Sequence, residues 1–491
     1  MMKRYQFWFV VGTQHLYGED IFEIINSRAQ EMAETISKAL LPFSELEFKV
    51  LAKTSEEIYQ VFKEANQNDD LAGIITWMHT FSPSKMWIKG LSILQKPLLH
   101  LHTQYHQDIP WNEINMDFMN LNQAAHGDRE HGHIFTKMRK NRKVISGYFK
   151  DETVLARIAQ WTQSAVGYME SHRINVIRFG DNMRNVAVTE GDKVDAQIKL
   201  GWSVQTYGVG DLVQAVNAVT PLELKTQMER YASRYDFDLK DIKAIEYQAK
   251  LQIGIDTFLR SKNGSAFTTT FEDLHGLDQL PGLSAQDLMG EGYGFAGEGD
   301  WKTAALLRVV KLMTNNDTQV ASFMEDYTYH LEKNNELVLG AHMLEICPSI
   351  ASGRPKIEVH PLGIGGKNNP ARLTFDAKTG QALQISIIDL GDRFRMIIAE
   401  CDAVKPLQNM PNLPVARAMW KLLPDFHTAT EAWILAGGAH HTVMIYNADP
   451  IIFKDLADML GIECIHIGAH TKISELQKEL MFNDVIYGFK R

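Results

Sequence analysis

Apolar and polar positions follow two different rhythms along the first part of the chain. Apolar or alternating runs typical of strands occupy residues 5–11, 47–52, 72–78 and 97–102. Amphipathic spacing typical of helices occupies residues 22–40 and 56–65. Because the two patterns follow one another in turn, they predict a parallel sheet with helices on both faces.

The alternation of strand and helix patterns is interrupted between residues 111 and 142. This stretch is polar and rich in Asn, His and Arg, with NLNQAAHGDREHGH at its centre. A long polar excursion from a compact domain is more often a site or an interface than a plain connection. We therefore expect this segment to contribute to function.

A second α/β region follows, and the last part of the chain differs from both. Residues 154–170 have helical spacing, residues 175–179 predict a strand that ends in the loop GDNMR, and AFTTTF at 266–271 is strand-like. From about residue 320, strand and turn signals alternate in ARLTFD, QALQISIID and RFRMIIAEC. Such alternation indicates antiparallel strands.

The length of the chain favours several domains. A single hydrophobic core stops growing near roughly 250–300 residues, and this chain has 491. The predicted fold class is α/β, with two doubly wound, Rossmann-like parallel-sheet domains followed by a mostly antiparallel β domain. We expect these domains to span residues 1–170, 171–318 and 319–491.

Composition disfavours two kinds of partner. The chain has 50 Lys and Arg against 60 Asp and Glu, a formal charge of −10 that is spread along the sequence without a charged tail. This balance argues against a nucleic-acid partner. No run approaches the roughly 18 consecutive apolar residues that a membrane-spanning helix needs, so we expect no membrane partner either.

Cysteine usage favours a reducing compartment. Cys347, Cys401 and Cys464 are odd in number and widely spaced, which fits neither a disulfide framework nor a Cys-x-x-Cys motif. The apolar run at residues 7–11 is too short for the core of a signal peptide. We expect a cytoplasmic protein.

Two glycine-rich segments are similar to nucleotide-binding loops but lack the required context. Gly292, Gly294 and Gly297 satisfy G-x-G-x-x-G, yet the preceding SAQDLMGE is polar and helical where the dinucleotide fingerprint needs a buried strand. In LGIGGKN, Pro361 replaces the first glycine of a phosphate loop, and Asn368 replaces the Ser or Thr that holds magnesium. A dehydrogenase would depend wholly on the first motif.

Two groups of histidines are candidates for a functional role. His100, His102 and His106 lie on or just after an apolar strand, where a hydrogen-bonded structural role is the commoner case. His440 and His441 in GGAHHT follow the apolar run WILA, which we interpret as a strand, and the small residues around them leave room for a ligand. Spacing alone leaves a structural and a ligand-binding role equally open for this pair.

Longer motifs resemble the L-arabinose isomerase family. In chain order they are WFVVGTQHLYG, WMHTFSPSKMWI, MDFMNLNQAAHGDRE, RFGDNMRNVAVTEGDKV, TTTFEDLHG, GYGFAGEGDWKTAALLR, SFMEDYTYH, LGAHMLEICPSI, LGIGGK, AWILAGGAHHT and YGFKR. So many matches in one order exclude coincidence. Asp128 departs from the family pattern, which has a second glycine after Gly127, and we expect the effect to be confined to that loop.

The resemblance implies a metal-dependent aldose–ketose isomerase with one divalent ion per subunit. Carried over to this sequence, the metal ligands are Glu298, Glu325, His342 and His441, which lie 27, 17 and 99 residues apart and form no local motif. Two oxygen and two nitrogen donors suit Mn2+, with Co2+ or Mg2+ as weaker candidates. The lack of thiolate ligands argues against a structural zinc site.

By the same resemblance, Glu298 and Glu325 are the catalytic acid and base. Moving a hydrogen from C2 to C1 of an aldose requires a base at carbon and an electrophile at the carbonyl oxygen. The implied reaction converts L-arabinose to L-ribulose through a cis-enediol. Asp300, Glu345 and His440 adjoin the ligands and could orient them, although a plain structural role is equally open.

The resemblance also implies a sugar pocket that subunits share. The sugar contacts carried over are Gln14, Leu16, Tyr17, Met183, Thr268, Phe271 and Ile364. His126, in the polar segment, resembles a histidine that reaches into a neighbouring subunit's site. This implies a homo-oligomer, and by similarity a hexamer.

Two other functions remain open. An isomerase of the L-fucose type shares the three-domain plan, and substrate profiling would separate it from an arabinose enzyme. A non-catalytic sugar-binding protein also has two α/β domains around a cleft, and it would bind sugar without metal or turnover. The N-terminus disfavours this second alternative, because periplasmic binding proteins carry signal peptides.

Overall fold

The chain divides into two units. The computed structural model describes residues 3–16, 19–40, 44–81, 83–314 and 321–488. The first unit comprises Met1–Met169 and Ile451–Met459, and the second comprises Glu170–Pro450 and Leu460–Arg491.

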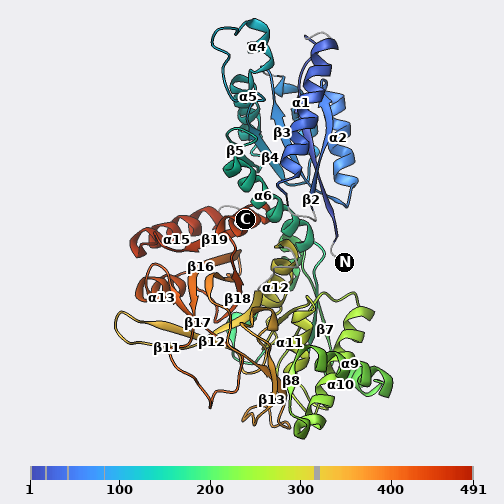
Figure 1. The fold of residues 1–491 in the computed structure, drawn as a ribbon, viewed down its shortest axis with the longest axis vertical. Coiled ribbons are helices and arrows are strands. Elements are labelled where there is room, and N and C mark those ends of the chain that lie inside the picture. The colour runs from blue at the N-terminus through green and yellow to red at the C-terminus, as the bar shows by residue number, and fades with distance from the viewer. Residues whose placement is uncertain (1–2, 17–18, 41–43, 82, 315–320, 489–491) are drawn as a thin grey trace. The chain divides into compact units, whose positions relative to one another are not determined.

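A five-stranded parallel sheet forms the centre of the first unit, in the order β2-β1-β3-β4-β5 (Figure 1). Its strands are β1 (Tyr5–Gly12), β2 (Ser44–Ala52), β3 (Leu71–Met78), β4 (Leu98–His102) and β5 (Lys143–Ser146). The accompanying helices are α1 (Glu19–Ser37), α2 (Ser55–Gln67), α3 (Ile88–Ile93), α4 (Met116–Leu121), α5 (Ala124–Lys137) and α6 (Glu152–Ser171), with a short 3-10 helix η1 (Ser84–Trp87). The predicted parallel α/β arrangement is confirmed.

Alternate residues of β1 supply two hydrophobic cores, one on each face of this sheet. Phe7 and Phe9 pack with residues of α1 and α6, whereas Trp8 and Val10 pack with residues of α2, α3 and α5. Successive side chains of a strand point to opposite faces. The sheet is therefore covered by helices on both sides, as expected for a doubly wound domain.

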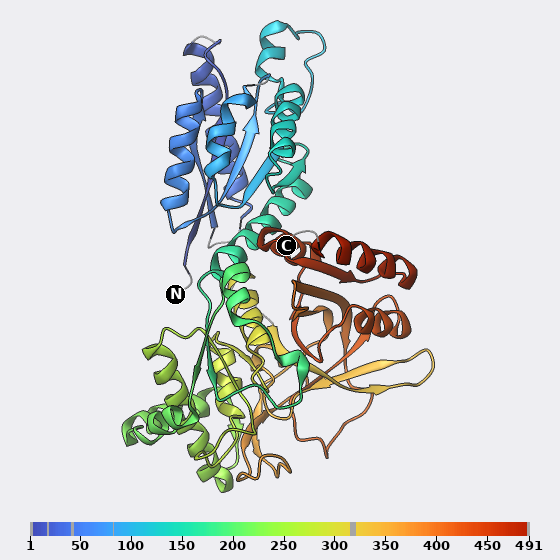
Figure 2. The same ribbon diagram turned by 180° about the vertical axis from the view of Figure 1, so that it is seen from behind.

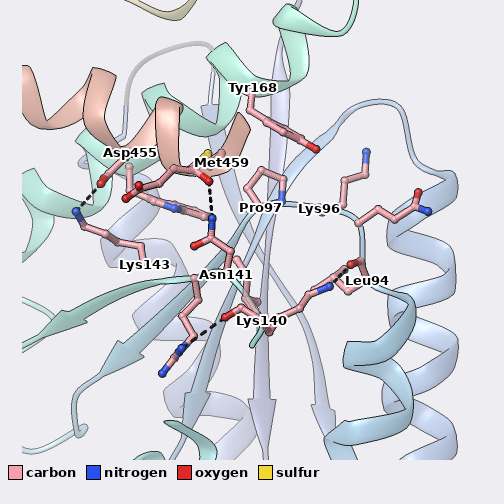
Figure 3. Close-up of a pocket in the computed structure, with 14 residues that line it drawn as sticks. Leu94, Lys96, Pro97, Lys140, Asn141, Lys143, Tyr168, Asp455 and Met459 are labelled. Atoms are coloured by element: carbon pink, nitrogen blue, oxygen red, sulfur yellow. Dashed lines mark hydrogen bonds and ion pairs between the residues drawn. The ribbon is translucent and has the colours of Figure 1, made fainter. Parts of the chain in front are cut away.

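A helix from near the C-terminus completes the first unit. In α14 (Pro450–Leu460), the carbonyl of Ile452 accepts a hydrogen bond from the hydroxyl of Ser164 on α6 at 2.7 Å. Asp455 pairs with Lys143, the first residue of β5, at 2.7 Å, and Figure 3 shows this pair beside a cavity of about 190 Å³. These contacts attach α14 to the N-terminal sheet.

Asp128 acts well beyond a loop, so the expectation that its effect would stay local is wrong. It lies in helix α5, and its buried carboxylate accepts a hydrogen bond from the backbone N–H of Met78 at 3.1 Å. The same carboxylate lies 2.9 Å from His100 Nε2 and 2.9 Å from His102 Nδ1. The hydrogen bond with Asp128 raises the pKa of His102, although burial opposes it. One side chain thus ties α5 to β3 and β4.

Two further sheets open the second unit. A parallel sheet in the order β10-β9-β6-β7 consists of β6 (Asn175–Phe179), β7 (Ser203–Tyr207), β9 (Ala266–Thr269) and β10 (Gly294–Ala296). A small sheet in the order β14-β13-β8 consists of β8 (Asp236–Phe237), β13 (Lys356–Val359) and β14 (Ala371–Thr374). The helices of this region are α7 (Lys193–Leu200), α8 (Val209–Asn217), α9 (Pro221–Arg234), α10 (Ile242–Ser261), α11 (Leu283–Gly290) and α12 (Trp301–Met313). Three short 3-10 helices are η2 (Ala187–Thr189), η3 (Leu239–Asp241) and η4 (Pro348–Ile350).

A closed six-stranded antiparallel barrel forms the rest of the second unit, seen from two sides in Figure 1 and Figure 2. Its strands are β11 (Ala321–His330), β12 (Leu337–Ala341), β15 (Gly380–Asp389), β16 (Phe394–Val404), β17 (Arg417–Leu422) and β18 (His441–Tyr446). The barrel closes because β15 pairs with both β18 and β16. Strand β19 (Glu463–Ile467) adds to β16 in parallel, and the helices here are α13 (Phe426–Leu435) and α15 (Ile473–Gly488). The predicted antiparallel β region is confirmed.

The run WILA is helical, so its interpretation as a strand is wrong. Trp433 to Leu435 form the last turn of α13. A four-residue apolar run suits either a strand or a helix, and the deciding signal lies upstream. The side chain of Asp425 accepts the backbone N–H of Thr428 and caps the helix.

The residues before the glycine motif form helix α11, and Gly294 itself begins strand β10. Across the described ranges, none of the helices is both long and apolar enough to cross a bilayer.

Candidate active site

Glu298 occupies a strained backbone position just after β10, at the carboxyl end of the parallel sheet. Its φ is +61°, a left-handed value that residues other than glycine seldom adopt. A Cβ on neighbouring Gly297 would lie 2.9 Å from Cε1 of His342, and one on Gly299 would lie 2.5 Å from the carbonyl oxygen of Asp181. The two glycines therefore let the His342 ring and the 181–182 backbone approach Glu298 closely.

The barrel supplies the other side chains of the site. Glu325 lies on β11, where its register partners are His441 on β18 and Ala341 on β12. His342 follows Ala341 directly, and His440 precedes β18. Because β11 pairs with both neighbouring strands, residues far apart in sequence meet at one place.

Glu298, His440 and His441 form a group that could hold a metal ion. One ligand atom from each lies within 4.8 Å of the others. Oε2 of Glu298 is 3.4 Å from Nε2 of His440 and 3.8 Å from Nε2 of His441. This group contains two of the four predicted ligands together with His440, which we had expected to orient them. Glu325 and His342 are not members of this group.

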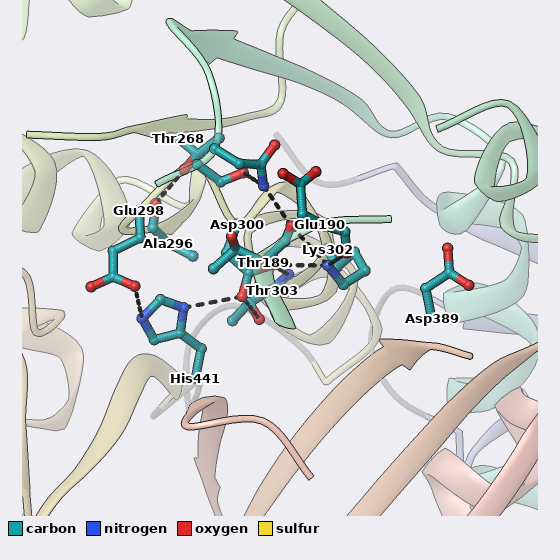
Figure 4. A network of polar contacts seen from close by, with 12 residues as sticks. Thr189, Glu190, Thr268, Ala296, Glu298, Asp300, Lys302, Thr303, Asp389 and His441 are labelled. Atoms are coloured by element: carbon teal, nitrogen blue, oxygen red, sulfur yellow. Dashed lines mark hydrogen bonds and ion pairs between the residues drawn. The ribbon is translucent and has the colours of Figure 1, made fainter. Parts of the chain in front are cut away.

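Two of the histidines are held by carboxylates. Nδ1 of His441 lies 3.1 Å from Oδ2 of Asp300, and Figure 4 shows the ring between Asp300 and Glu298. Nδ1 of His342 lies 2.5 Å from Oε2 of Glu345. Metal-binding histidines commonly donate their second N–H to a carboxylate in this way.

The Nε2 atom of His441 supports the same interpretation. The side chain is fully buried, and Nε2 has no hydrogen-bond partner among the residues described. A buried polar atom without a partner is costly. With Nδ1–H donated to Asp300, Nε2 presents its lone pair toward Glu298, as a metal ligand requires. The donor set therefore fits a divalent cation.

The carboxylates of this network are held ionised. Burial alone would raise the pKa of Glu298, but the hydrogen bond with His440 and the nearby rings of His441 and His342 lower it. Burial likewise opposes ionisation of Asp300, yet Lys302 and His441 lower its pKa to about 2. Negative charge is therefore available at neutral pH to bind a cation.

The protonation of His342 is also governed by its surroundings. Burial lowers the pKa of this ring, but the neighbouring Glu345, Glu325 and Glu298 raise it overall. Glu298 and Glu325 also raise the pKa of His440, so the Glu325 carboxylate acts on two histidines of the site.

Three predicted sugar contacts of the second unit adjoin this network. Phe271 and Ile364 line a cavity of about 30 Å³ together with Glu298 and His342. The backbone N–H of Met183 donates to the carbonyl of Glu298 at 2.9 Å. An apolar wall and the GDNMR loop therefore lie directly beside the candidate metal ligands.

Thr268 is placed differently. Its side chain is fully buried on β9, and its hydroxyl donates to the carbonyl of Ala296 on β10 at 2.7 Å. The hydroxyl therefore supports the strand that leads to Glu298.

Two predicted contacts of the first unit, Gln14 and His126, lie close to Phe81. Nε2 of Gln14 donates to the carbonyl of Phe81 at 3.5 Å, and the Phe81 ring lies 6.2 Å from the ring of His126. Leu16 is 74 % exposed. Tyr17 lies outside the described residues. Gln14, which follows β1, and His126, near the start of α5, thus both contact Phe81.

Lys302 is a part of the network that sequence reasoning did not single out. It is fully buried near the start of α12, and its ammonium lies 3.8 Å from Oδ1 of Asp300 (Figure 4). The available signal was weak, because Lys302 is one of three basic residues in the helical segment WKTAALLRVVKLM. Charged lysines are rarely buried unless they are paired.

Known proteins and family models are similar to this chain over nearly its whole length. Family models match consecutive segments: the L-arabinose isomerase N-terminal domain over residues 1–173, the central domain over 175–316 and the C-terminal domain over 320–463. The L-arabinose isomerase of Anoxybacillus flavithermus is 53 % identical over 100 % of this chain and 99 % of its own. That of Geobacillus stearothermophilus is 53 % identical over 99 % of both chains, and that of Clostridium beijerinckii is 52 % identical over 99 % of both.

Proposed function

The chain belongs to the L-arabinose isomerase family, and on that basis we propose that it interconverts L-arabinose and L-ribulose. The observation that carries this proposal is the buried His441, whose Nδ1 is held by Asp300 and whose Nε2 faces Glu298. An aldose–ketose isomerase of this kind needs a cation site with carboxylates beside it.

We further propose a metal ligand set of Glu298, Glu325, His342 and His441 that binds one Mn2+ per subunit, with Co2+ or Mg2+ as substitutes. The chemistry of two carboxylates and two imidazoles supports manganese. His440, 3.4 Å from Glu298, then orients that carboxylate. Asp300 and Glu345 orient the two histidines through their Nδ1 atoms.

The residues of the chain then perform the proton transfer. A bound divalent ion supplies an electrophile for the oxygens on C1 and C2 of the open-chain sugar. One of Glu298 and Glu325 removes the proton from C2 while the other donates a proton to the C1 oxygen, which gives the enediol. The second glutamate then takes the proton of the C2 hydroxyl as the first returns its proton to C1, which gives the ketose and restores both side chains. The ionised state of Glu298 supports its role as a base. Phe271 and Ile364 keep water from the reacting carbons on one side.

The test is incubation of metal-stripped protein with L-arabinose, with and without added Mn2+, followed by assay of L-ribulose. We expect turnover only with the metal. No L-ribulose at saturating Mn2+ would exclude the proposed function. Parallel assays with L-fucose distinguish the related isomerase, and sugar binding without turnover would indicate a binding protein.

An isotope experiment tests the enediol. Reaction in deuterated water through many forward and reverse turnovers should place deuterium at C1 of L-ribulose, because a carboxylate that carries the proton exchanges it with solvent. Complete retention of the original C2 hydrogen would favour a direct hydride shift. Glu298 and Glu325 would then act as metal ligands alone.

We propose that the sugar pocket is shared between subunits. The sugar contacts that we propose are Gln14, Leu16, Tyr17, Met183, Thr268, Phe271 and Ile364, and His126 reaches into the site of a neighbouring subunit. The exposure of His126 on α5 supports a contact outside its own chain. The assembly that we propose is a homohexamer, and the partner in solution is the small sugar substrate.

We also propose domain bounds and a cellular compartment for this protein. The domains span residues 1–170, 171–318 and 319–491, which the ranges matched by the three family models support. The protein works in the cytoplasm, where Cys347, Cys401 and Cys464 stay reduced, and the odd number and wide spacing of these cysteines support this.

A further inference from the structure

Lys302 is an unusual residue for its position in the fold. Its side chain is 1 % exposed and lies near the N-terminus of α12. A positive charge there opposes the positive end of the helix dipole, and burying an ammonium is costly unless it is well paired. Burial lowers the pKa of Lys302, while Asp300, Asp389 and Glu190 act in the opposite direction. We therefore ask which contacts of the Lys302 ammonium compensate for the free-energy cost of burying it.

The ammonium of Lys302 joins three parts of the second unit. Nζ donates to the carbonyl of Thr189 at 3.0 Å and to that of Glu190 at 2.5 Å. It also lies 3.8 Å from Oδ1 of Asp300. Figure 4 shows these groups converging on one nitrogen. One side chain thus connects α12, the end of η2 and the carboxylate that holds His441.

Lys302 holds the end of the segment 182–190, which begins within the GDNMR loop. Nδ2 of Asn182 donates to the carbonyl of Thr189 at 2.6 Å and to that of Gly299 at 3.2 Å. The backbone N–H of Met183 donates to the carbonyl of Glu298 at 2.9 Å. Lys302 therefore fastens the far end of a loop whose near end bears a proposed sugar contact.

On its other side, Lys302 acts on Asp300. Oδ2 of Asp300 lies 3.1 Å from Nδ1 of His441 and accepts a hydrogen bond from the hydroxyl of Thr303 at 2.7 Å. A fully buried carboxylate is stable as an anion only with compensating charge and hydrogen bonds. Lys302 supplies the nearest fixed positive charge to Asp300 among the described residues. It thereby keeps Asp300 able to hold the His441 ring.

We propose that Lys302 is a positioning residue that couples the sugar side and the metal side of the site, acting on the metal through Asp300 and His441 and on the sugar through the 182–190 loop. This inference rests on the proposed function, because it presumes that His441 binds the metal. Lys302 itself contacts neither the metal nor the sugar in this account.

Lys311 provides a matched control on the same helix. Its side chain is also buried, and its ammonium donates to the carbonyl of Ala321 at 3.1 Å. It also donates to Sγ of Cys347 at 3.5 Å. Among the described residues, neither Asp300 nor residues 182–190 form a hydrogen bond or ion pair with Lys311. Lys302→Met and Lys311→Met therefore each remove one buried ammonium from α12, and only the first removes the contacts with Asp300 and with Thr189 and Glu190.

The first test measures Mn2+ binding to the metal-stripped full-length protein by titration calorimetry, together with KM and kcat for L-arabinose. We expect Lys302→Met to weaken Mn2+ binding at least tenfold and to raise KM, in the range found when groups that orient metal ligands are lost. We expect Lys311→Met to lower the melting temperature but to leave the Kd for Mn2+ within about twofold of wild type. Equal effects of the two variants on Kd, or no effect of Lys302→Met, would overturn the inference.

A double-mutant cycle with Asp300→Asn tests the route. The double variant removes both buried charges, so it leaves no unpaired ion that could prevent folding. If Lys302 acts through Asp300, then Lys302→Met in the Asp300→Asn background should change the Kd for Mn2+ by less than about threefold. The rise in KM should persist there, because the loop contacts do not pass through Asp300. A full tenfold loss of Mn2+ affinity in that background would overturn the inference.

The same titrations separate this inference from the proposed function. If the wild type fails to bind Mn2+, the proposed metal function is overturned, and the proposed role of Lys302 is overturned as well. If the wild type binds Mn2+ and Lys302→Met binds it equally tightly, only the role of Lys302 is overturned.

Discussion

Glu325 and His441 are direct register partners on the antiparallel strands β11 and β18. On the other side of β11, Glu325 pairs with Ala341, the residue before His342. Side chains of directly opposed residues on one face of a sheet lie close together. The register of three barrel strands therefore gathers residues that are up to 116 positions apart in the sequence.

This relationship makes Glu325→Gln a sharp test of the proposed ligand set. The change keeps the shape of the side chain but removes its charge, so the loss should fall on metal binding and proton transfer. We expect less than about a tenth of wild-type turnover at saturating Mn2+, weaker Mn2+ binding in calorimetry and an unchanged circular dichroism spectrum. The matched control is Glu332→Gln, because Glu332 is exposed in the same β11–β12 hairpin and should be replaceable without loss. Activity above that level in Glu325→Gln would remove Glu325 from the site.

The buried His79 should make the stability of the protein depend on pH. Burial, with a contribution from Arg28, lowers the pKa of His79 to about 3. An unfolded histidine titrates near 6.5, so between these values the unfolded state binds a proton that the folded state does not. The free energy of unfolding therefore decreases as the pH falls from 6.5 toward 3.

His79→Gln should remove this dependence. Between pH 6.5 and 5.0 we expect the wild type to lose about 1.5 kcal/mol more than the variant in urea unfolding. His133→Gln is the control, because His133 is exposed on α5 and its replacement leaves His79 in place. Parallel losses in the wild type and His79→Gln would contradict the assignment of this pH dependence to His79.

Removing the carboxylate of Asp128 should destabilise the N-terminal sheet. Asp128→Ala leaves the backbone N–H of Met78 and the buried ring of His100 without their shared acceptor. Each unsatisfied buried group costs about 1–3 kcal/mol. We expect a fall of several degrees in melting temperature, whereas Glu130→Ala, on the same helix, should change it little. Similar melting temperatures for both variants would show that Asp128 is not needed for this packing.

Complementation between inactive variants tests the shared site. His126→Ala and Glu298→Ala subunits, co-expressed with different affinity tags and purified through both, should form mixed oligomers that regain part of the activity. Some sites in such oligomers combine an intact His126 from one subunit with an intact Glu298 from another. The control pairs Glu298→Ala with His342→Ala, whose lesions lie in the same half of the site, and should stay inactive. Inactive His126/Glu298 mixtures would place His126 outside catalysis.

The parallel strands were the most predictable part of the fold. Strands buried on both faces are continuous apolar runs, and β1 and β3 differ from their predicted bounds by one residue at one end each. The run WILA could not be assigned in the same way, because four apolar residues suit a helix equally well and the capping Asp425 lies eight residues before Trp433.

The candidate site could not be derived from spacing. Glu325, His342 and His441 meet through strand register in the barrel, and no periodicity in the sequence encodes which strands become neighbours. Only the family resemblance suggested these residues. The resemblance did not reveal Lys302, whose importance follows from burial and from carbonyls of a loop more than 100 positions away.

The attachment of α14 to the N-terminal sheet has a consequence for biosynthesis. Ser164 and Ile452, which are hydrogen-bonded, are 288 residues apart. At roughly 5–20 residues per second, a ribosome needs about 15–60 s to make the chain between them. The first unit is therefore begun first but completed only after most of the second unit has been made. Until α14 emerges, its binding surface, which includes Lys143 and Ser164, stays exposed on the nascent chain.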